Sequence, residues 1–243
     1  MRFCRFCRTF VRIIRYKSVF TEFMKIVNLG EGNSVVNSYM EQLRDVAYQQ
    51  NRTLFRNNLK RIGRVIAYEL SRTLDYSPKL VQTPLGVKEM DAVDDHIVVG
   101  TVLRAGLAFH EGFVEVFDRA DAAFVAAYRE EGLKEELKIS LDYLASPALD
   151  GCTFLLVDPM LATGGSLELA YQAFLRTGTP RKLHICCVIA AEEGIEHLRR
   201  LFPSDEVTLW VAAVDKELNE HAYIVPGLGD AGDLSFGPKL SLK

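Results

Sequence analysis

The chain has 243 residues, 49% of them hydrophobic, and a formal net charge of −3. This length allows one large domain or two small ones, and the apolar fraction excludes a compositionally disordered chain. No apolar run approaches the roughly 20 residues that cross a bilayer, so we expect no membrane segment. The negative net charge argues against a general nucleic-acid surface.

Residues 1–23 differ from the rest of the chain because they carry a net charge of +5. Such a segment is typical of an arm, a targeting peptide or an amphipathic anchor. A plainer alternative is that the chain starts at Met24, or that the segment is disordered. We predict a basic extension over residues 1–23 and, because linker signals are absent, one domain over residues 24–243.

The sequence holds five cysteines. Cys4 and Cys7 form a single C-x-x-C without a second pair or nearby histidines, which supports zinc only weakly. Cys186 and Cys187 lie in an apolar run and are predicted to fill the core. An odd count without a signal peptide favours the reducing cytoplasm.

The first structured region, from Val35 to about Leu74, is predicted to be helical in two pieces. The second piece, from about Thr53, has apolar residues at helical spacing and a basic opposite face. We expect that face to be solvated; the alternative is that Arg52 or Arg56 reaches an anionic ligand or a partner subunit. Arg44 and Asp45 are interpreted as a helix or interface pair.

The segment from Tyr76 to Asp95 contains Pro78 and Pro84. Prolines interrupt regular structure, so we predict an irregular segment that covers one edge of a sheet.

Short apolar runs then alternate with helical patterns through the rest of the chain. This alternation predicts an α/β fold with a mostly parallel central sheet, helices on both faces and a small hood or tail region. The charged segment 130–138 has no clear period and is predicted to be a mobile excursion. The predicted strands are His96–Leu103, Ala122–Tyr128, Ile139–Tyr143, Phe154–Val157, Lys182–Ala190 and Val207–Val214, and the predicted helices after the first strand end near Phe117, Leu175 and Leu201.

The most informative stretch is Asp158–Ser166, here called the glycine turn. It follows a buried strand and precedes a helix that runs to Leu175, with Ser166 expected near the N-cap. Glycines let backbone N–H groups approach an anion, hydroxyls add donors, and a helix N-terminus adds positive potential. The order of these features therefore predicts a phosphate site, although it fits neither the Walker loop nor the dinucleotide fingerprint.

Two further stretches have the composition of a binding site. Arg104 and Gly106 follow a predicted strand and precede a helix, where a cation meets an anion, although a surface arginine is the alternative. The stretch Asn219–Asp233, here called the tail, is rich in glycine beside apolar residues. Such backbone can lie close to a flat heterocycle and read it through N–H and C=O groups; a plain surface loop is the alternative.

The glycine turn resembles the phosphoribosyl pyrophosphate site of type I phosphoribosyltransferases, in the form found in the uracil phosphoribosyltransferase family. Leu103–Gly106, Tyr128-Arg129 and the tail are similar to that family too, and the tail marks its uracil branch. The resemblance runs from about Met24 to the C-terminus. It implies transfer of a phosphoribosyl group to uracil, which gives UMP and pyrophosphate.

The resemblance also implies roles for single residues. Asp158 would hold the ribose hydroxyls, the turn would bind the terminal phosphate, and two arginines would hold the pyrophosphate. The implied catalytic residues are Arg104, Asp158 and Asp230. The residues implied in binding phosphoribosyl pyrophosphate are Arg104, Arg129, Asp158, Pro159, Met160, Leu161, Ala162, Thr163, Gly164, Gly165, Ser166 and Asp230. The residues implied in reading uracil, largely through main-chain groups, are Ile224, Gly229, Asp230 and Ala231.

The family resemblance implies magnesium as cofactor, bound through pyrophosphate and ribose oxygens and not directly by the protein. It further implies a homodimer or a higher homo-oligomer, a GTP effector as in some relatives, and a strained or cis peptide within Leu103–Gly106. Segment 130–138 is the candidate lid. The chain departs from the family pattern at Gln49–Arg56, and Pro159 replaces a second acid, a feature that the uracil branch shares.

Two other functions are compatible with parts of this pattern. A non-catalytic nucleotide-binding regulator would keep the fold, but the retained tail argues against it. A transferase for another base, such as a purine, would lack the tail. His221 is interpreted as structural and not as a general base.

Overall fold

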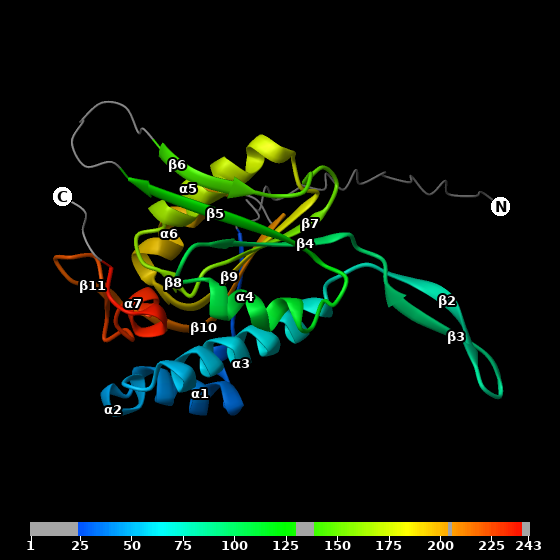
Figure 1. Ribbon diagram of the computed structural model, residues 1–243, viewed down its shortest axis with the longest axis horizontal. Helices are drawn as coiled ribbons and strands as arrows, with labels where there is room; N and C mark the ends of the chain where they lie inside the picture. Colours follow the sequence, from blue (N-terminus) through cyan, green and yellow to red (C-terminus); the bar gives the residue numbers. More distant parts are fainter. Residues whose placement is uncertain (1–23, 130–138, 204–205, 240–243) are drawn as a thin grey trace, which may run out of the picture.

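The computed structural model describes residues 24–129, 139–203 and 206–239. Its centre is one sheet in which the strands follow the order β1-β10-β9-β7-β4-β5-β6, with β8 paired to β9 (Figure 1). The sheet strands are β1 (Lys25–Asn28), β4 (Ile97–Val102), β5 (Asp121–Arg129), β6 (Ile139–Ala145), β7 (Thr153–Val157), β8 (Met160–Leu161), β9 (Lys182–Ala191) and β10 (Val207–Asp215). The helices are α1 (Val35–Arg44), α2 (Val46–Gln49), α3 (Arg52–Ser71), α4 (Leu107–Val114), α5 (Gly165–Phe174), α6 (Glu192–Leu201) and α7 (Ala231–Phe236).

The predicted α/β architecture is confirmed. Every neighbouring pair along the sheet is parallel except β5 and β6, which are antiparallel. All of β7 and nearly all of β9 are buried, which explains why these strands appear in the sequence as continuous apolar runs and not as alternating ones. The predicted strands were therefore recognisable from apolar runs between helical patterns.

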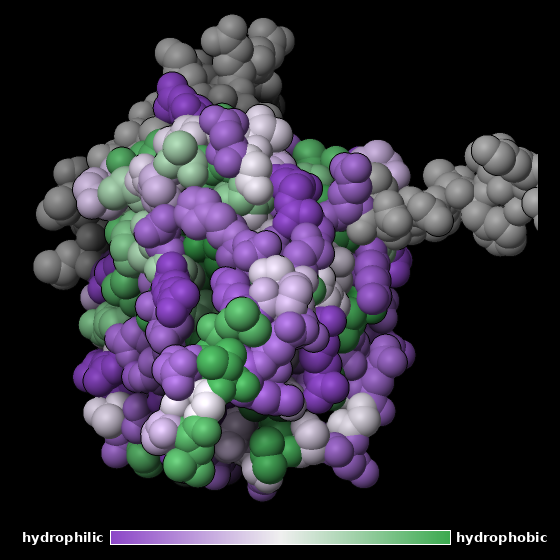
Figure 2. Space-filling model, turned by 90° about the vertical axis from the view of Figure 1, so that its right-hand side faces the viewer, coloured by the Kyte–Doolittle hydropathy of each residue, from purple (hydrophilic) through white to green (hydrophobic). Residues whose placement is uncertain are grey.

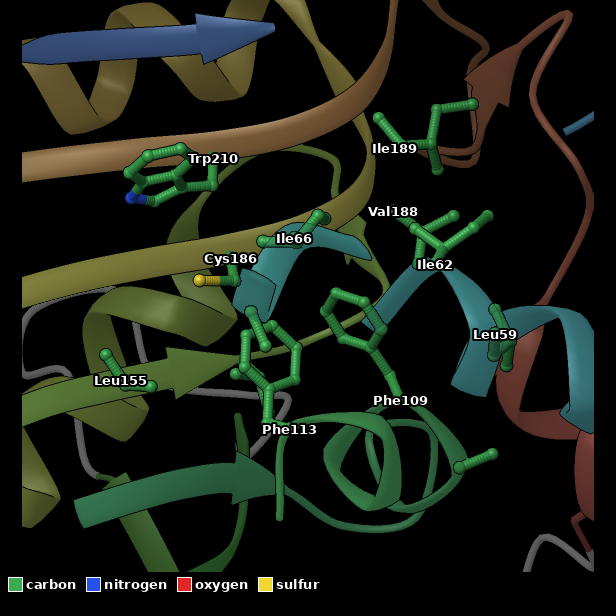
Figure 3. Packing of buried hydrophobic residues seen from close by; sticks show 14 of the residues in the cluster. Leu59, Ile62, Ile66, Phe109, Phe113, Leu155, Cys186, Val188, Ile189 and Trp210 are labelled. Carbon is green, nitrogen blue, oxygen red and sulfur yellow. The ribbon is translucent and has the colours of Figure 1, made fainter. Parts of the chain in front are cut away.

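Helices cover both faces of the sheet and create two hydrophobic clusters. Successive residues of one strand point to opposite faces, so Cys186 joins the cluster under α1, α3 and α4, whereas Cys187 joins the one under α5 and α6. Figure 3 shows the first cluster, where side chains of α3 lie against Phe109 and Phe113 of α4 and against β9. Both cysteines fill the core, as predicted.

The segment Tyr76–Asp95 corrects one prediction. It is a regular antiparallel hairpin of β2 (Tyr76–Thr83) and β3 (Gly86–Val93), and among the described residues its strands pair only with each other. Figure 1 shows it projecting from the body and covering no sheet edge. Pro78 is compatible with β2 because each strand of a two-stranded hairpin has one free edge, where no N–H donor is needed. Pro84 lies in the turn that connects the two strands.

The N-terminal helices also differ in detail from the prediction. Three helices replace two, because the side chains of Asp45 and Asn51 each accept hydrogen bonds from the backbone N–H groups two and three residues further on and so start a new helix. The interpretation of Arg44 and Asp45 as a pair was wrong, since Arg44 bonds to Asp215. The basic face of α3 is only partly solvated: Lys60 and Arg64 pair with Glu115 of α4.

Two sequence predictions fall on residues outside the described ranges. These are the basic extension 1–23, with Cys4 and Cys7, and the candidate lid 130–138. Among the helices that the structure does describe, none is long and apolar enough to cross a membrane.

Candidate active site

The site lies where two parallel strands end side by side. β4 and β7 are neighbours in the sheet, so Leu103–Gly106 after β4, here called the arginine turn, meets the glycine turn after β7. Carboxyl ends of adjacent parallel strands form the usual ligand crevice of such sheets. The peptide bond between Leu103 and Arg104 is cis, as the family resemblance implied.

The glycine turn is fixed to the strand beside it. Met160 and Leu161 form the short strand β8 against β9, and the carbonyl of Pro159 accepts N–H groups from Val188 and Ile189 at 3.1 and 3.0 Å. The sequence indicated only a turn here, because two residues are too few to show a period. This pairing gives the first half of the turn a defined backbone.

The second half of the turn leads into α5 and presents N–H groups at the helix start. The N-cap is Gly164 and not the predicted Ser166; its φ is 88° and it supplies no side-chain cap. A Cβ at Gly164 would lie 2.7 Å from the ring of His197 on α6, so only glycine fits. The exposed hydroxyls of Thr163 and Ser166 flank the uncapped N–H groups, an arrangement suited to a phosphate.

Asp158 is the first residue of the glycine turn and is buried. Its Oδ1 accepts one protein hydrogen bond, from the Met160 N–H at 3.3 Å. Burial raises the pKa of Asp158 to about 7, against a smaller lowering by that hydrogen bond. A desolvated carboxyl with so few donors is suited to meet hydroxyl donors or a cation from a ligand.

Arg104 reaches from the arginine turn toward the C-terminal region. Its Nη2 donates to Asp233 at 3.3 Å and to the Gly237 carbonyl at 3.1 Å. Its Nε is buried and has no hydrogen-bond partner among the described residues. This arginine therefore keeps donor capacity beside the glycine turn, as an anion site needs.

The tail folds over the same end of the sheet. It contains the short strand β12 (Ile224–Val225), paired with β11 (Glu217–Leu218), and then α7. Asp230 starts α7 by accepting the Asp233 N–H at 2.9 Å. A Cβ at Gly232 would lie 3.6 Å from the Cβ of Ala105, so the tail contacts the arginine turn directly. The sequence predicted the tail but not its helix, which has only six residues.

One cavity of about 260 Å³ joins the three segments. Of the predicted site residues, it is lined by Arg104, Asp158, Met160, Leu161, Ala162, Thr163, Gly164, Ser166 and Asp230. Pro159 and Gly165 belong to the same turn but do not line it. A larger hollow of about 500 Å³ over α1–α3 is lined by acidic and neutral residues without a cation, and so does not fit a polyphosphate.

The remaining predicted residues lie outside this cavity. The side chains of Ile224 and Ala231 are buried in the core, so only their backbone groups could face a ligand, and Gly229 is exposed with φ 86°. Arg129 ends β5, but its side chain is outside the description. His221 is exposed and contacts Glu220, which fits a residue without a catalytic role.

Sequence reasoning missed several residues that complete the site. Lys239 adds a cation to the cavity wall, and no motif marks it. Arg44, Gln49 and Arg56 all donate to backbone carbonyls of the tail or α7: Gly227, Leu228 and Ser235. The alternative for Arg56, that it reaches a ligand or partner, was open; here it contacts this chain's own C-terminal helix.

The cavity offers two carboxylates, from Asp158 and Asp230, and among the described residues no group of three His, Cys, Asp or Glu could hold a metal. Magnesium commonly keeps several waters and binds through one or two carboxylates plus substrate phosphates. The donor set therefore fits a magnesium ion bound mainly through ligand oxygens, and does not form a protein cage.

Comparison with known proteins agrees with this geometry. Residues 31–238 match the family model for uracil phosphoribosyltransferase. The chain is 44% identical over 217 residues to uracil phosphoribosyltransferase of Porphyromonas gingivalis, covering 89% of this chain and all of that protein. It is 39% identical to the Pyrococcus furiosus enzyme of the same name, over 77% of this chain and 81% of that one. The structure of AQ2163 protein from Aquifex aeolicus superimposes with a TM-score of 0.77 at 33% identity, covering 89% of this chain and all of that one. The chain belongs to the uracil phosphoribosyltransferase family.

Proposed function

We propose that this protein transfers the phosphoribosyl group of phosphoribosyl pyrophosphate to uracil, giving UMP and pyrophosphate. The observation that carries the proposal is the single cavity lined by the glycine turn, the arginine turn and Asp230 of the tail. It brings a phosphate site and a base-reading segment to the two sides of one hollow. Family membership supports the same reaction.

The glycine turn binds the ribose phosphate in this proposal. Backbone N–H groups at the start of α5 and the hydroxyls of Thr163 and Ser166 donate to the phosphate oxygens. Asp158 accepts hydrogen bonds from the ribose hydroxyls, which add to the one that it accepts among the described residues. Both contacts orient the anomeric carbon toward the tail.

The chemistry takes place at that anomeric carbon. The bond to uracil N1 forms, the bond to the pyrophosphate oxygen breaks, the electron pair leaves with pyrophosphate, and the N1 proton passes to solvent. Negative charge gathers on the leaving group, where Arg104 and Arg129 stabilise it. One preorganised donor of this kind typically contributes about 3–4 kcal/mol.

If a magnesium ion binds here, Asp158 is the carboxylate that would help to hold it, together with oxygens of the ligand. The ion would neutralise charge on the pyrophosphate when bound. The protein's own part is to orient the donor and to exclude water from the anomeric carbon.

Uracil is read by backbone groups of Ile224, Gly229, Asp230 and Ala231. Backbone donors and acceptors at fixed positions reject a base with a different edge, because buried polar groups would then lack partners. This argues against a purine as substrate. The donor-binding elements that share one cavity would be superfluous in a regulator without activity.

We also propose a homodimer or higher homo-oligomer in the cytoplasm, with GTP as effector. The β2–β3 hairpin supports self-association, because Leu80, Leu85 and Val87 are 72%, 99% and 63% exposed. Figure 2 shows hydrophobic residues gathered among hydrophilic ones on the side where the hairpin projects. Sedimentation velocity of the native chain and of Val87→Glu tests the assembly; a monomer at all concentrations contradicts it.

The reaction is tested with labelled uracil, phosphoribosyl pyrophosphate and magnesium, with and without GTP. Labelled UMP is expected, and omission of magnesium should lower its rate. Absence of UMP under all conditions would favour a regulator, whereas product from hypoxanthine or xanthine in place of uracil would favour a transferase for another base.

A further inference from the structure

Arg44 and Asp215 lie 171 positions apart in the chain but form a two-pronged ion pair. Arg44 is the last residue of α1, and Asp215 is the last residue of β10. The guanidinium donates from Nη1 to Oδ2 at 2.7 Å and from Nη2 to Oδ1 at 2.8 Å. The Asp215 side chain is 9% exposed and the Arg44 side chain 28%, so the carboxylate is shielded from water and the guanidinium only partly.

Both members of this pair also bind the same backbone residue of the tail. The carboxylate of Asp215 accepts the Gly227 N–H at 2.8 Å, and Arg44 donates to the Gly227 carbonyl at 2.9 Å. Gly227 has a φ of 61°, and a Cβ there would clash with the carbonyl of Ile224. The ion pair therefore holds both polar groups of a residue whose conformation is restricted to glycine.

The residues that follow Gly227 are the ones proposed to read the base. Gln49 donates to the carbonyl of Leu228 at 2.7 Å, so two consecutive carbonyls are fixed from the N-terminal helices. Gly229 and Asp230 come next, and Asp230 lines the cavity. We propose that Arg44 and Asp215 are positioning residues that set the base-reading backbone of the tail, an inference that rests on the proposed function.

The electrostatics of the pair fit this role. Burial alone would raise the pKa of Asp215, but the hydrogen bonds from Arg44 and from the Gly227 N–H outweigh it and the net pKa is lowered. Asp215 is thus the charged partner of Arg44. Buried ion pairs often add little net stability but can enforce one conformation. Here the conformation enforced is that of the tail.

The inference predicts an effect on one substrate only. Neither Arg44 nor Asp215 lines the cavity, and the glycine turn is held instead by β9 and α6. We expect Arg44→Gln and Asp215→Asn each to raise the KM for uracil by about tenfold. The KM for phosphoribosyl pyrophosphate should change by less than about twofold, and Arg44→Lys should recover part of the loss.

The double variant and a matched control sharpen the test. Because the two side chains act as a unit, the double variant should be no worse than the worse single one. Arg64→Gln breaks an ion pair between α3 and α4 with the same change of charge, and should leave both KM values unchanged. Additive losses in the double variant, or equal rises in both KM values, would overturn the proposal.

Amide hydrogen exchange of peptides covering 219–233 gives a readout that needs no catalysis. We expect faster exchange in this segment for Arg44→Gln and Asp215→Asn, with peptides covering 158–166 unchanged. Unchanged exchange in the tail of folded variants would contradict the positioning role. If the native chain makes no UMP, the proposed function fails, but the exchange experiment still decides whether the pair holds the tail.

Discussion

The glycine turn and the tail line the same cavity, but the chain holds them in different ways. The glycine turn is fixed by its neighbours in the sheet, through β8 and the carbonyl of Pro159, and by α6, which follows soon after in the chain. The tail is fixed by Arg44 and Gln49, and α7 at its end by Arg56, all from the first quarter of the sequence. A phosphate site can thus be a local motif, whereas a base-reading segment needs remote support.

The largest effect is expected at Arg104, which lines the cavity together with both regions. Arg104 lines the cavity and donates to Asp233 and Gly237. Arg104→Ala should lower kcat/KM by about 100- to 1,000-fold, because one preorganised donor to the leaving group is lost. Steady-state kinetics measure this. Arg72→Ala, which removes a side chain that is 62% exposed, is the control. Loss of less than tenfold in a folded Arg104 variant would refute the role.

The second largest effect is expected for a substitution in the glycine turn alone. Asp158→Asn should lower kcat/KM by roughly 10- to 100-fold, since hydrogen bonds to a charged acceptor are replaced by weaker ones. The KM for the phosphoribosyl donor should account for more of the loss than the KM for uracil. A rise in the KM for uracil alone would contradict the separate roles of the glycine turn and the tail.

The same residue predicts a pH dependence of stability. The pKa of Asp158 in the folded protein, about 7, lies above the ordinary value of 3.8. Between these values the folded state binds the proton and the unfolded state does not, so this group's contribution to stability is present below about pH 4 and is lost as pH rises through about 7. Asp158→Asn should be less sensitive in this window and more stable than the native chain above pH 7. Denaturant unfolding without ligand measures the free energy of unfolding of both proteins at each pH. If the native chain and Asp158→Asn showed the same dependence on pH, the raised pKa of Asp158 would be contradicted.

A comparison of Gly164 with Gly151 separates the cost of backbone strain from the cost of a steric clash. Gly164→Ala and Gly151→Ala both place a Cβ at positive φ, 88° and 72°, but only the first meets His197, because nothing lies within 4 Å of the second. We expect about 1 kcal/mol of destabilisation at Gly151 and about 2–3 kcal/mol at Gly164. In urea unfolding, Gly164→Ala should cost less stability when it is made in the His197→Ala variant, because the ring that its Cβ would meet is then absent. Equal costs in the two single variants would show that α6 does not restrain the turn.

The smallest effect concerns the tail. Gln49→Ala removes the amide that donates to the carbonyls of Leu228 and Leu43, and should raise the KM for uracil by roughly fivefold with the KM for phosphoribosyl pyrophosphate unchanged. Gln50→Ala is the matched control, because among the described residues the Gln50 side chain donates to Val46 of α2 and not to the tail. A change in both KM values for Gln49→Ala would mean that the helices support more than the tail.

The parts of the fold that the sequence predicted are those with long, uniform patterns. Apolar runs such as Lys182–Ala190 indicated buried strands, which the structure extends here by one residue to Ala191. The glycine turn has its donor groups in consecutive residues, so its chemistry could be predicted from the sequence. The β2–β3 hairpin was missed because Pro78 argues against a strand unless a free edge is known. β8 and α7 were missed because two and six residues show no period.

The support of the tail was beyond local reasoning for a different reason. Asp45 follows Arg44 directly, so proximity in sequence favoured a pair between them. In the fold, Asp45 is used to start α2, and the guanidinium finds Asp215 instead. Such partners depend on which element ends meet in space, which single-residue patterns do not encode. Lys239 could not be predicted as a cavity residue for the same reason.

The measurement that tests the central claim most directly is a crystal structure with UMP bound. The account predicts that the phosphate accepts hydrogen bonds from backbone N–H groups of Thr163–Ser166, that the ribose hydroxyls face Asp158, and that the uracil ring lies against Gly229–Ala231. A UMP molecule bound outside this cavity, or with its base turned away from the tail, would contradict it.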